Sequence, residues 1–308
     1  MNMEKTSPLG NRSGQLSTLL ANGKARLLSR LAPGLSNQQI DSMLFSPDTV
    51  ERKPIRLPRG FEQFVIKTGD GNLQAYRAGR GPTVVFIHGW GGGAYQFFPL
   101  MRGLARCGFS TLAFDHLGHG LSDAKPTTLH QSIDSCNVVL EQVKKSDDGL
   151  VAAVGHATGC IAIANARPPL VRDLPLFLIA PVFNYKLFLL RRLVGLQLPA
   201  DVVRQYTSRF SRNYRQAYQR HELARKLPPY ADYTVIAHDE SDSEAAAADS
   251  IRFCQRYPLT RLLLTREADH RRVISSESVW QELKTHLNYE DTTINFVTEV
   301  IDKFPPTT

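Results

Sequence analysis

The sequence predicts an α/β fold in which helices cover both faces of a mostly parallel β-sheet. The chain has 308 residues, 42% of them hydrophobic, which is enough for a full core. Short, continuous apolar segments recur along it, and most of the segments between them have the length of a helix. Apolar strands that alternate with helices are typical of a parallel sheet buried on both sides.

The strands are expected in a regular order from Phe61 onward. Phe61–Thr68 and Leu73–Ala78 flank the turn-forming residues Gly69 to Asn72, which predicts a β-hairpin. The later strand candidates are the apolar segments Val84–Ile87, Ser110–Phe114, Leu150–Val154, Leu176–Ile179, Thr234–Ala237 and Arg261–Leu264.

One connection in this pattern is too long for a simple crossover and predicts an inserted helical lid at residues 183–229. Aromatic and leucine residues recur there at near-helical intervals, and we interpret most of the rings as the core of the lid. The predicted organisation is an N-terminal arm (1–59), a core in two parts (60–182 and 230–289), the lid between them, and a C-terminal helix and tail (290–308).

The N-terminal arm contains a predicted basic amphipathic helix at residues 14–32. Its leucines recur at helical spacing beside Lys24, Arg26 and Arg30, and Pro33-Gly34 ends it. The leucines are expected to dock on the domain. The alternatives are peripheral contact with an anionic membrane surface and an organelle-targeting peptide.

The net charge of +8 is concentrated in one segment of the chain. The segment from Asn184 to Lys226 contains ten basic residues and only two acidic ones, Asp201 and Glu222. Most of its arginines are expected to form a solvated surface, and some to contact an anionic substrate group or a membrane. No RNA-binding aromatic signature or zinc-finger spacing accompanies the charge, so no nucleic-acid partner is predicted.

The remaining sequence signals predict a cytoplasmic protein without a metal or cofactor. The four cysteines are scattered, without the spacing of a disulfide scaffold or a zinc site. We find neither a secretory signal nor an apolar run long enough for a membrane span.

The most informative motif is Val154-Gly155-His156-Ala157-Thr158-Gly159. It matches the strand-to-helix turn Gly-x-Ser-x-Gly, which presents a catalytic serine in a strained, exposed conformation. Here the serine position holds Ala157, which has no nucleophilic atom. The Thr158 side chain is expected to point away from the tip of this turn, and neither Cys160 nor Ser241 is an obvious replacement.

A second motif, His88-Gly89-Trp90-Gly91-Gly92-Gly93, follows the strand candidate Val84–Ile87. It lacks the Lys-Ser/Thr pair of a phosphate-binding loop and the spacing of a dinucleotide fingerprint. Glycine-rich turns of this kind can also direct backbone N–H groups at an oxyanion. We therefore predict an oxyanion hole formed by the amides of Trp90 and Thr158.

Together with Phe114-Asp115-His116-Leu117-Gly118-His119-Gly120-Leu121-Ser122, these motifs make the chain from about Phe61 to Leu287 resemble the α/β-hydrolase superfamily. The resemblance implies the chain order nucleophile, acid, histidine. It assigns the acid to Asp242 in His238-Asp239-Glu240-Ser241-Asp242, and the histidine to His270 in a segment similar to the Gly-His-Arg-Arg stretch of a bacterial branch. Asp269 departs from that stretch by replacing its glycine, and its charge could raise the pKa of His270 or compete with Asp242.

Three functions are compatible with Ala157. The first is weak or serine-independent hydrolysis of a small ester, acyl or aromatic compound, with His270 and Asp242 activating water. The second is a catalytically inactive pseudo-hydrolase that binds such a ligand or a partner. The third is an ordinary serine esterase in which a Ser-to-Ala substitution traps the substrate.

Overall fold

The computed structural model describes residues 36–45, 56–123, 127–266 and 268–287. The basic helix predicted at residues 14–32 and the C-terminal helix and tail predicted at 290–308 lie outside these ranges, so both stay predictions. None of the described helices is long and apolar enough to cross a membrane.

The described residues form one eight-stranded sheet in the order β1-β2-β4-β3-β5-β6-β7-β8. β1 and β2 form the predicted hairpin, β2 pairs antiparallel with β4, and all further neighbours are parallel. The α/β-hydrolase architecture predicted from the motifs is therefore confirmed. The strands are Phe61–Lys67 (β1), Asn72–Ala78 (β2), Thr83–Ile87 (β3), Ser110–Phe114 (β4), Leu150–His156 (β5), Leu176–Ile179 (β6), Thr234–Asp239 (β7) and Arg261–Thr265 (β8).

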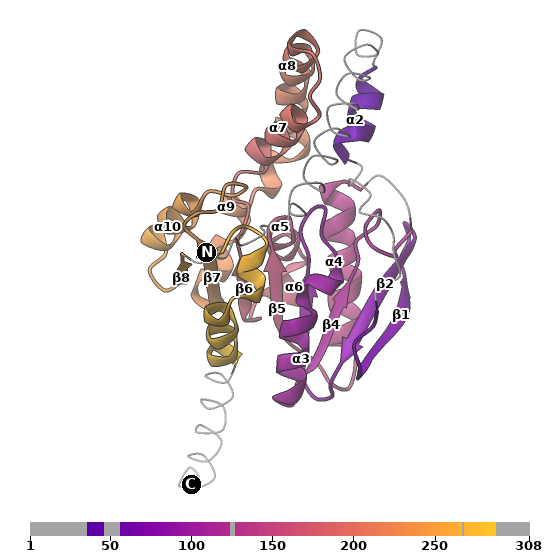
Figure 1. The fold of residues 1–308 in the computed structure, drawn as a ribbon, viewed down its shortest axis with the longest axis vertical. Helices are drawn as coiled ribbons and strands as arrows, with labels where there is room; N and C mark the ends of the chain where they lie inside the picture. Colours follow the sequence, from indigo (N-terminus) through magenta and orange to yellow (C-terminus); the bar gives the residue numbers. More distant parts are fainter. Residues whose placement is uncertain (1–35, 46–55, 124–126, 267, 288–308) are drawn as a thin grey trace, which may run out of the picture.

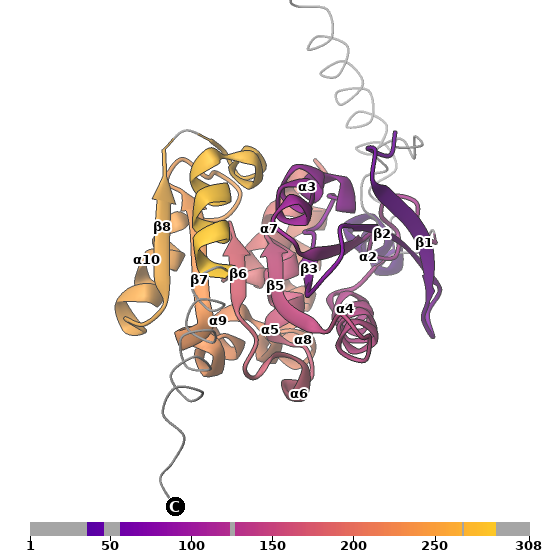
Figure 2. The ribbon, with the colours of Figure 1, turned by 90° about the horizontal axis from the view of Figure 1, so that it is seen from below.

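Helices cover both faces of the sheet, as the continuous apolar strands predict (Figure 2). In β3, Val84 and Phe86 pack with α3 and the helix 277–287, whereas Val85 and Ile87 pack with α4 and α5. The helices of the sheet domain are Phe98–Arg106 (α3), Leu129–Lys144 (α4), Thr158–Ala164 (α5), Pro168–Val171 (α6) and Ala247–Arg256 (α10).

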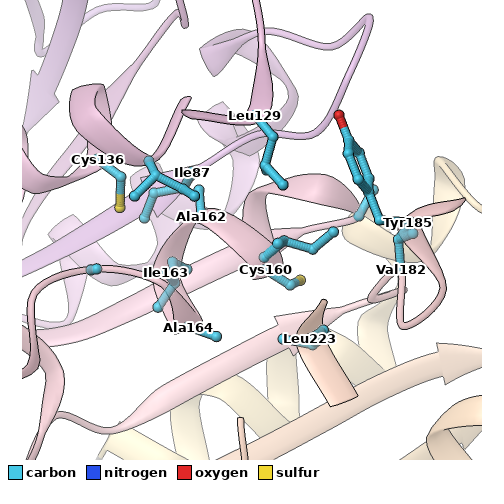
Figure 3. Packing of buried hydrophobic residues seen from close by; sticks show 14 of the residues in the cluster. Ile87, Leu129, Cys136, Cys160, Ala162, Ile163, Ala164, Val182, Tyr185 and Leu223 are labelled. Atoms are coloured by element: carbon cyan, nitrogen blue, oxygen red, sulfur yellow. The ribbon is translucent and has the colours of Figure 1, made fainter. Parts of the chain in front are cut away.

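Local sequence signals explain where several of these helices begin. Thr128 and Gln131 form a reciprocal capping box at the start of α4, and the Asn184 side chain accepts a hydrogen bond from the Leu187 N–H at the start of the helix Tyr185–Gly195 (α7). Figure 3 shows residues of α5, among them Cys160, Ala162 and Ile163, at the centre of the packing.

The segment predicted as a lid contains Tyr185–Gly195 (α7), Ala200–Ala217 (α8), the short helical turn Gln219–His221 (η3) and Leu223–Lys226 (α9). Figure 1 shows α7 and α8 extending beyond the sheet, with α2 (Asn37–Phe45) beside them. The hydroxyl of Tyr206 on α8 donates a hydrogen bond to Asp41 on α2. This contact joins α2 to α8.

The aromatic residues of α8 have two roles. Tyr206, Phe210 and Tyr214 are buried and pack against one another along one face of the helix. They also line a cavity of about 380 Å³ between α2 and α8. A cavity at this place was not foreseen, because only the folded chain brings α2 against the lid.

Candidate active site

The turn between β5 and α5 has the backbone conformation of a nucleophile elbow. Ala157 adopts φ 51° and ψ −116°, a region that side-chain-bearing residues rarely occupy. Its N–H donates to the Ile179 carbonyl, and the side chain is buried. The chain thus holds a strained conformation that costs about 1–3 kcal/mol at a residue whose side chain has no nucleophilic atom.

Two glycines allow the neighbouring segments to approach this turn. A Cβ atom on Gly89 would lie 2.7 Å from the Ala157 Cβ, and one on Gly159 would lie 2.2 Å from the Ile87 carbonyl oxygen. Side chains at either position would force the segments apart. The glycines therefore explain how the turn after β3 can pack directly against the elbow.

Asp242 and His270, predicted as the acid and the histidine, are in direct contact. The His270 Nδ1 lies 2.7 Å from the Asp242 Oδ2, and both side chains are almost fully buried. A carboxylate accepts hydrogen bonds, so Nδ1 carries the proton and Nε2 keeps its lone pair. This is the tautomer that a general base requires.

The loop after β7 holds the Asp242 carboxylate in place. Its Oδ1 accepts hydrogen bonds from the N–H groups of Glu244 and Ala245, both at 2.8 Å. Its Oδ2 accepts a further hydrogen bond from the His238 Nε2 at 3.2 Å. Burial by itself raises the pKa of Asp242, but the hydrogen bonds from His238, His270 and the backbone outweigh it and hold the pKa well below its usual range. Asp242 is therefore ionised near neutral pH.

The loop that carries His270 is hydrogen-bonded to a second histidine, His156, in the elbow. The His156 Nε2 lies 2.8 Å from the His270 carbonyl oxygen and donates to it. Burial, followed by the neighbouring His270, lowers the pKa of His156 to about 3, so its ring is neutral. Because His156 directly precedes Ala157, this bond sets the position of the His270 backbone relative to Ala157.

Asp269, the departure beside His270, does not contact the imidazole through any of its described hydrogen bonds. Its carboxylate accepts the N–H groups of Arg271 and Arg272 and the Arg272 Nε, which closes the turn into Arg272–Ser275 (η5). These bonds lower the pKa of Asp269. The carboxylate thus serves the turn rather than competing with Asp242.

The predicted oxyanion turn has an unexpected contact. The Trp90 N–H donates to the Thr158 Oγ1 at 2.9 Å, so the amide predicted to bind an oxyanion is engaged by a side chain of the elbow. The Thr158 side chain was expected to point away from the tip of the elbow, and this contact shows that its hydroxyl reaches the turn after β3. Thr158 is the first residue of α5, where a hydroxyl can reach a neighbouring amide.

A buried histidine fixes the same turn from its other side. The Gly91 N–H donates to the His119 Nε2 at 3.1 Å, and the His119 Nδ1 bonds to the Leu117 carbonyl at 3.0 Å. Burial, and then the neighbouring His88, lowers the pKa of His119 to about 3. His119 therefore stays neutral and can accept the Gly91 bond.

Neither Cys160 nor Ser241 offers a free nucleophile beside Ala157. Cys160 is fully buried on α5 among apolar side chains that include Val182 and Leu223, and burial raises its thiol pKa (Figure 3). A thiol in such surroundings is not a nucleophile. The Ser241 hydroxyl bonds to Asp239 and to the Ala268 carbonyl.

The structure thus brings the predicted residues together in two connected groups. Asp242 and His270 form one, and Trp90 and Thr158 form the other beside Ala157. Sequence reasoning missed the contacts of His156 and His238. Both histidines could have been singled out in the sequence, since His156 directly precedes Ala157 in the elbow motif and His238 is the first residue of the motif that contains Asp242.

Comparisons with known proteins agree with this architecture. A family model described as the alpha/beta hydrolase fold matches residues 82–166, which include the oxyanion turn and the elbow. A curated 2-(acetamidomethylene)succinate hydrolase from Mesorhizobium japonicum is 33% identical over 111 residues. That match covers 35% of this chain and 39% of the relative, so the chain spans about two fifths of the length of the curated relative it matches.

Solved structures extend the similarity over most of the chain. Est1E from Butyrivibrio proteoclasticus matches with a TM-score of 0.56 and 18% identity, covering 73% of this chain and 99% of Est1E. A crystal structure of E-2-(acetamidomethylene)succinate hydrolase matches with a TM-score of 0.53 and 22% identity, covering 74% of this chain and 99% of that one. At these identities the structures show a shared fold.

Proposed function

Because the chain belongs to the α/β-hydrolase superfamily, we propose that it is a weak acyl-bond hydrolase that works without a serine nucleophile. The observation that carries the proposal is the 2.7 Å contact between His270 and Asp242, which remains in place around Ala157. A general base that is correctly oriented can act on water as well as on a hydroxyl group.

The proposed reaction uses water where the superfamily uses serine. His270 Nε2 takes a proton from a water molecule, whose oxygen attacks the carbonyl carbon of the substrate. The C=O electron pair moves onto oxygen and then returns as the leaving group departs, taking the proton from His270. Asp242 stabilises the imidazolium between these two steps.

The bond cleaved is an ester or an amide of a small acyl compound. The curated relative is named as a hydrolase of an acetamido compound, which supports including amides beside esters. No covalent acyl-enzyme forms, because Ala157 supplies neither oxygen nor sulfur. Turnover is therefore expected to be far below that of a serine hydrolase.

Replacing His270 tests this proposal. We expect wild-type protein to hydrolyse p-nitrophenyl acetate slowly, with a rate that rises with pH because a general base must be unprotonated, and His270→Gln to lose about 100-fold of the enzyme-dependent rate. His130→Gln, on α4 outside the site, is the control for non-specific reaction of histidines with the ester. Equal rates in wild type and His270→Gln would refute the proposed mechanism.

A second candidate function is ligand binding without catalysis. It is supported by the Thr158 hydroxyl, which occupies the Trp90 amide that would otherwise stabilise an oxyanion. In this case the pocket holds an ester, acyl or aromatic ligand, or the lid holds a partner, and the chemistry has been lost.

Thr158→Val separates the two candidates, because valine has a similar shape but cannot accept the Trp90 N–H. If the site is catalytic, freeing this amide should raise the His270-dependent rate by up to about 100-fold, the usual value of one oxyanion donor. The initial rate with p-nitrophenyl acetate measures this, with Thr127→Val as a matched control on the loop before α4. A rate that stays at the buffer level in Thr158→Val favours the binding function.

A further inference from the structure

One residue of the segment predicted as a lid contacts the loop that carries Asp242. Arg191 lies on α7, and its Nη1 donates hydrogen bonds to two consecutive backbone carbonyls, that of Ser243 at 3.3 Å and that of Glu244 at 2.7 Å. The Glu244 side chain has a different partner, because its Oε1 lies 3.7 Å from the Arg271 Nε. Arg191 therefore binds this loop through the main chain and not through the Glu244 carboxylate.

The two peptide groups that Arg191 binds are the same two that bind Asp242. The Ser243 carbonyl and the Glu244 N–H belong to one peptide group, and the Glu244 carbonyl and the Ala245 N–H belong to the next. Both N–H groups donate to the Asp242 Oδ1 at 2.8 Å. Both peptide groups are trans, so that each C=O points away from its own N–H. Arg191 and Asp242 therefore lie on opposite sides of the two peptide groups.

This arrangement strengthens the hydrogen bonds that the carboxylate accepts. A hydrogen bond donated to a peptide carbonyl polarises the group and strengthens the bond that its N–H donates, by about 10–30%. The donor here is a guanidinium, and charge-assisted hydrogen bonds are about twice as strong as neutral ones. Arg191 is exposed, so water screens its direct attraction to the buried Asp242 side chain. The two peptide groups are therefore the path through which Arg191 acts.

The next residue of α7 contacts the other group of candidate site residues. The guanidinium carbon of Arg192 is 4.8 Å from the centre of the Trp90 ring, and the Trp90 N–H donates to Thr158 beside the elbow. Consecutive side chains of a helix point about 100° apart, so two neighbouring arginines can contact two different loops. α7 thus contacts both the acid loop and the turn after β3.

We propose that Arg191 is a positioning residue of the candidate active site, which holds the Asp242 carboxylate towards His270 through these two peptide groups. The inference rests on the proposed function, since it assigns a further residue to the same site. His270 Nδ1 donates to Asp242 at 2.7 Å, so Arg191 acts on the general base through the acid. The position of α7 is then coupled to the geometry of the base, because a movement of α7 that breaks the two bonds also loosens Asp242.

Arg191→Met tests the proposal, because methionine keeps an unbranched apolar side chain but donates no hydrogen bond. In ¹H–¹⁵N spectra of the full-length protein, the amide protons of Glu244 and Ala245 should move upfield, as expected for weaker bonds to Asp242. The His270 Nδ1 proton should exchange with solvent about threefold faster. The His270-dependent kcat with p-nitrophenyl acetate should fall by about the same factor, with KM unchanged.

Two further variants separate the hydrogen bonds from the charge alone. Arg191→Lys retains a charged donor at the same place and should keep the amide shifts and the proton exchange close to the wild-type values. Arg204→Gln removes a positive charge from the exposed face of α8 and should change neither.

A double variant separates positioning from a purely structural role. Arg191→Met should lower the urea midpoint of the wild type, and this loss should be at least halved in the Asp242→Asn background, because the carboxylate through which Arg191 acts is absent there. A residue that only attaches α7 to the rest of the protein would give the same loss in both backgrounds.

Two outcomes would overturn the inference. One is an Arg191→Met spectrum in which the Glu244, Ala245 and His270 signals stay at their wild-type positions and exchange rates. The other is an equal loss of the urea midpoint in both backgrounds. If His270-dependent turnover persists in either case, the proposed function stands and only the role of Arg191 falls. If the signals respond as expected but the protein shows no turnover, Arg191 positions Asp242 in a site without hydrolysis and the proposed function falls.

Discussion

Ala157→Ser is expected to convert the protein into a serine hydrolase and to raise turnover of p-nitrophenyl acetate by about 1,000-fold or more, since loss of the nucleophile in a serine hydrolase costs about a millionfold. The reason lies in what Ala157 already has. Its backbone occupies the strained elbow conformation, and His270 is bonded to an ionised Asp242. The substitution adds one oxygen atom to the proposed site, in which His270 as the base and Asp242 as the orienting acid are already in contact.

Two readouts check this expectation. Ala157→Ser should react with a fluorophosphonate probe, and the initial rate of ester cleavage should show a burst from acyl-enzyme formation. The matched control is the double variant Ala157→Ser, His270→Gln, which carries the hydroxyl without its base and should remain unlabelled. If Ala157→Ser folds normally but stays inert to the probe, the groups around Ala157 are not a hydrolytic site and the ligand-binding function gains support.

The architecture was predictable because each strand carries its own signal. The apolar segments at Ser110–Phe114 and Leu176–Ile179 match β4 and β6 residue for residue, and the hairpin matches β1 and β2 to within one residue. The predicted ends of β5 and β7 were short by two residues, at the points where His156 and Asp239 follow the apolar run. These two polar residues are held by hydrogen bonds to the loop that carries His270, since His156 donates to the His270 carbonyl and Asp239 accepts the Ala268 N–H.

The contacts within the site depend on the folded geometry and could not be predicted. Thr158 and Trp90 are 68 residues apart in the sequence, and only the close packing at Gly89 brings the hydroxyl to the amide. The role of Asp269 depends on whether its carboxylate faces the imidazole or the following amides, which its position in the sequence leaves open. Arg192 is one of ten basic residues between Asn184 and Lys226, and only the fold shows that its guanidinium carbon lies 4.8 Å from the centre of the Trp90 ring.

Asp242→Asn is expected to remove both the orientation of His270 and a large electrostatic contribution to stability. In the Ala157→Ser background it should lower turnover by about 10,000-fold, the cost of losing the aspartate that sets the histidine tautomer in a well-studied serine protease. At about pH 7 it should lower the free energy of unfolding by about 3 kcal/mol, as is typical when one partner of a buried ion pair or hydrogen-bonded carboxylate is removed. Glu240→Gln, an exposed carboxylate on the same loop, is the matched control.

The stability difference should depend on pH in a definite direction. The pKa of Asp242 is depressed in the folded protein, so its stabilising contribution is complete above the carboxyl pKa of the unfolded chain, about 4, and is lost as the pH falls towards the folded value. Urea unfolding of wild type and Asp242→Asn should therefore show a constant gap from about pH 7 to pH 5 and a smaller gap at about pH 3. His238 and His270 both bond to this carboxylate. If the gap is unchanged at about pH 3, Asp242→Asn destabilises the protein because asparagine does not fit these two hydrogen bonds, and not because the negative charge is lost. A gap that closes in acid identifies the Asp242 charge as the group that holds the two histidines in place.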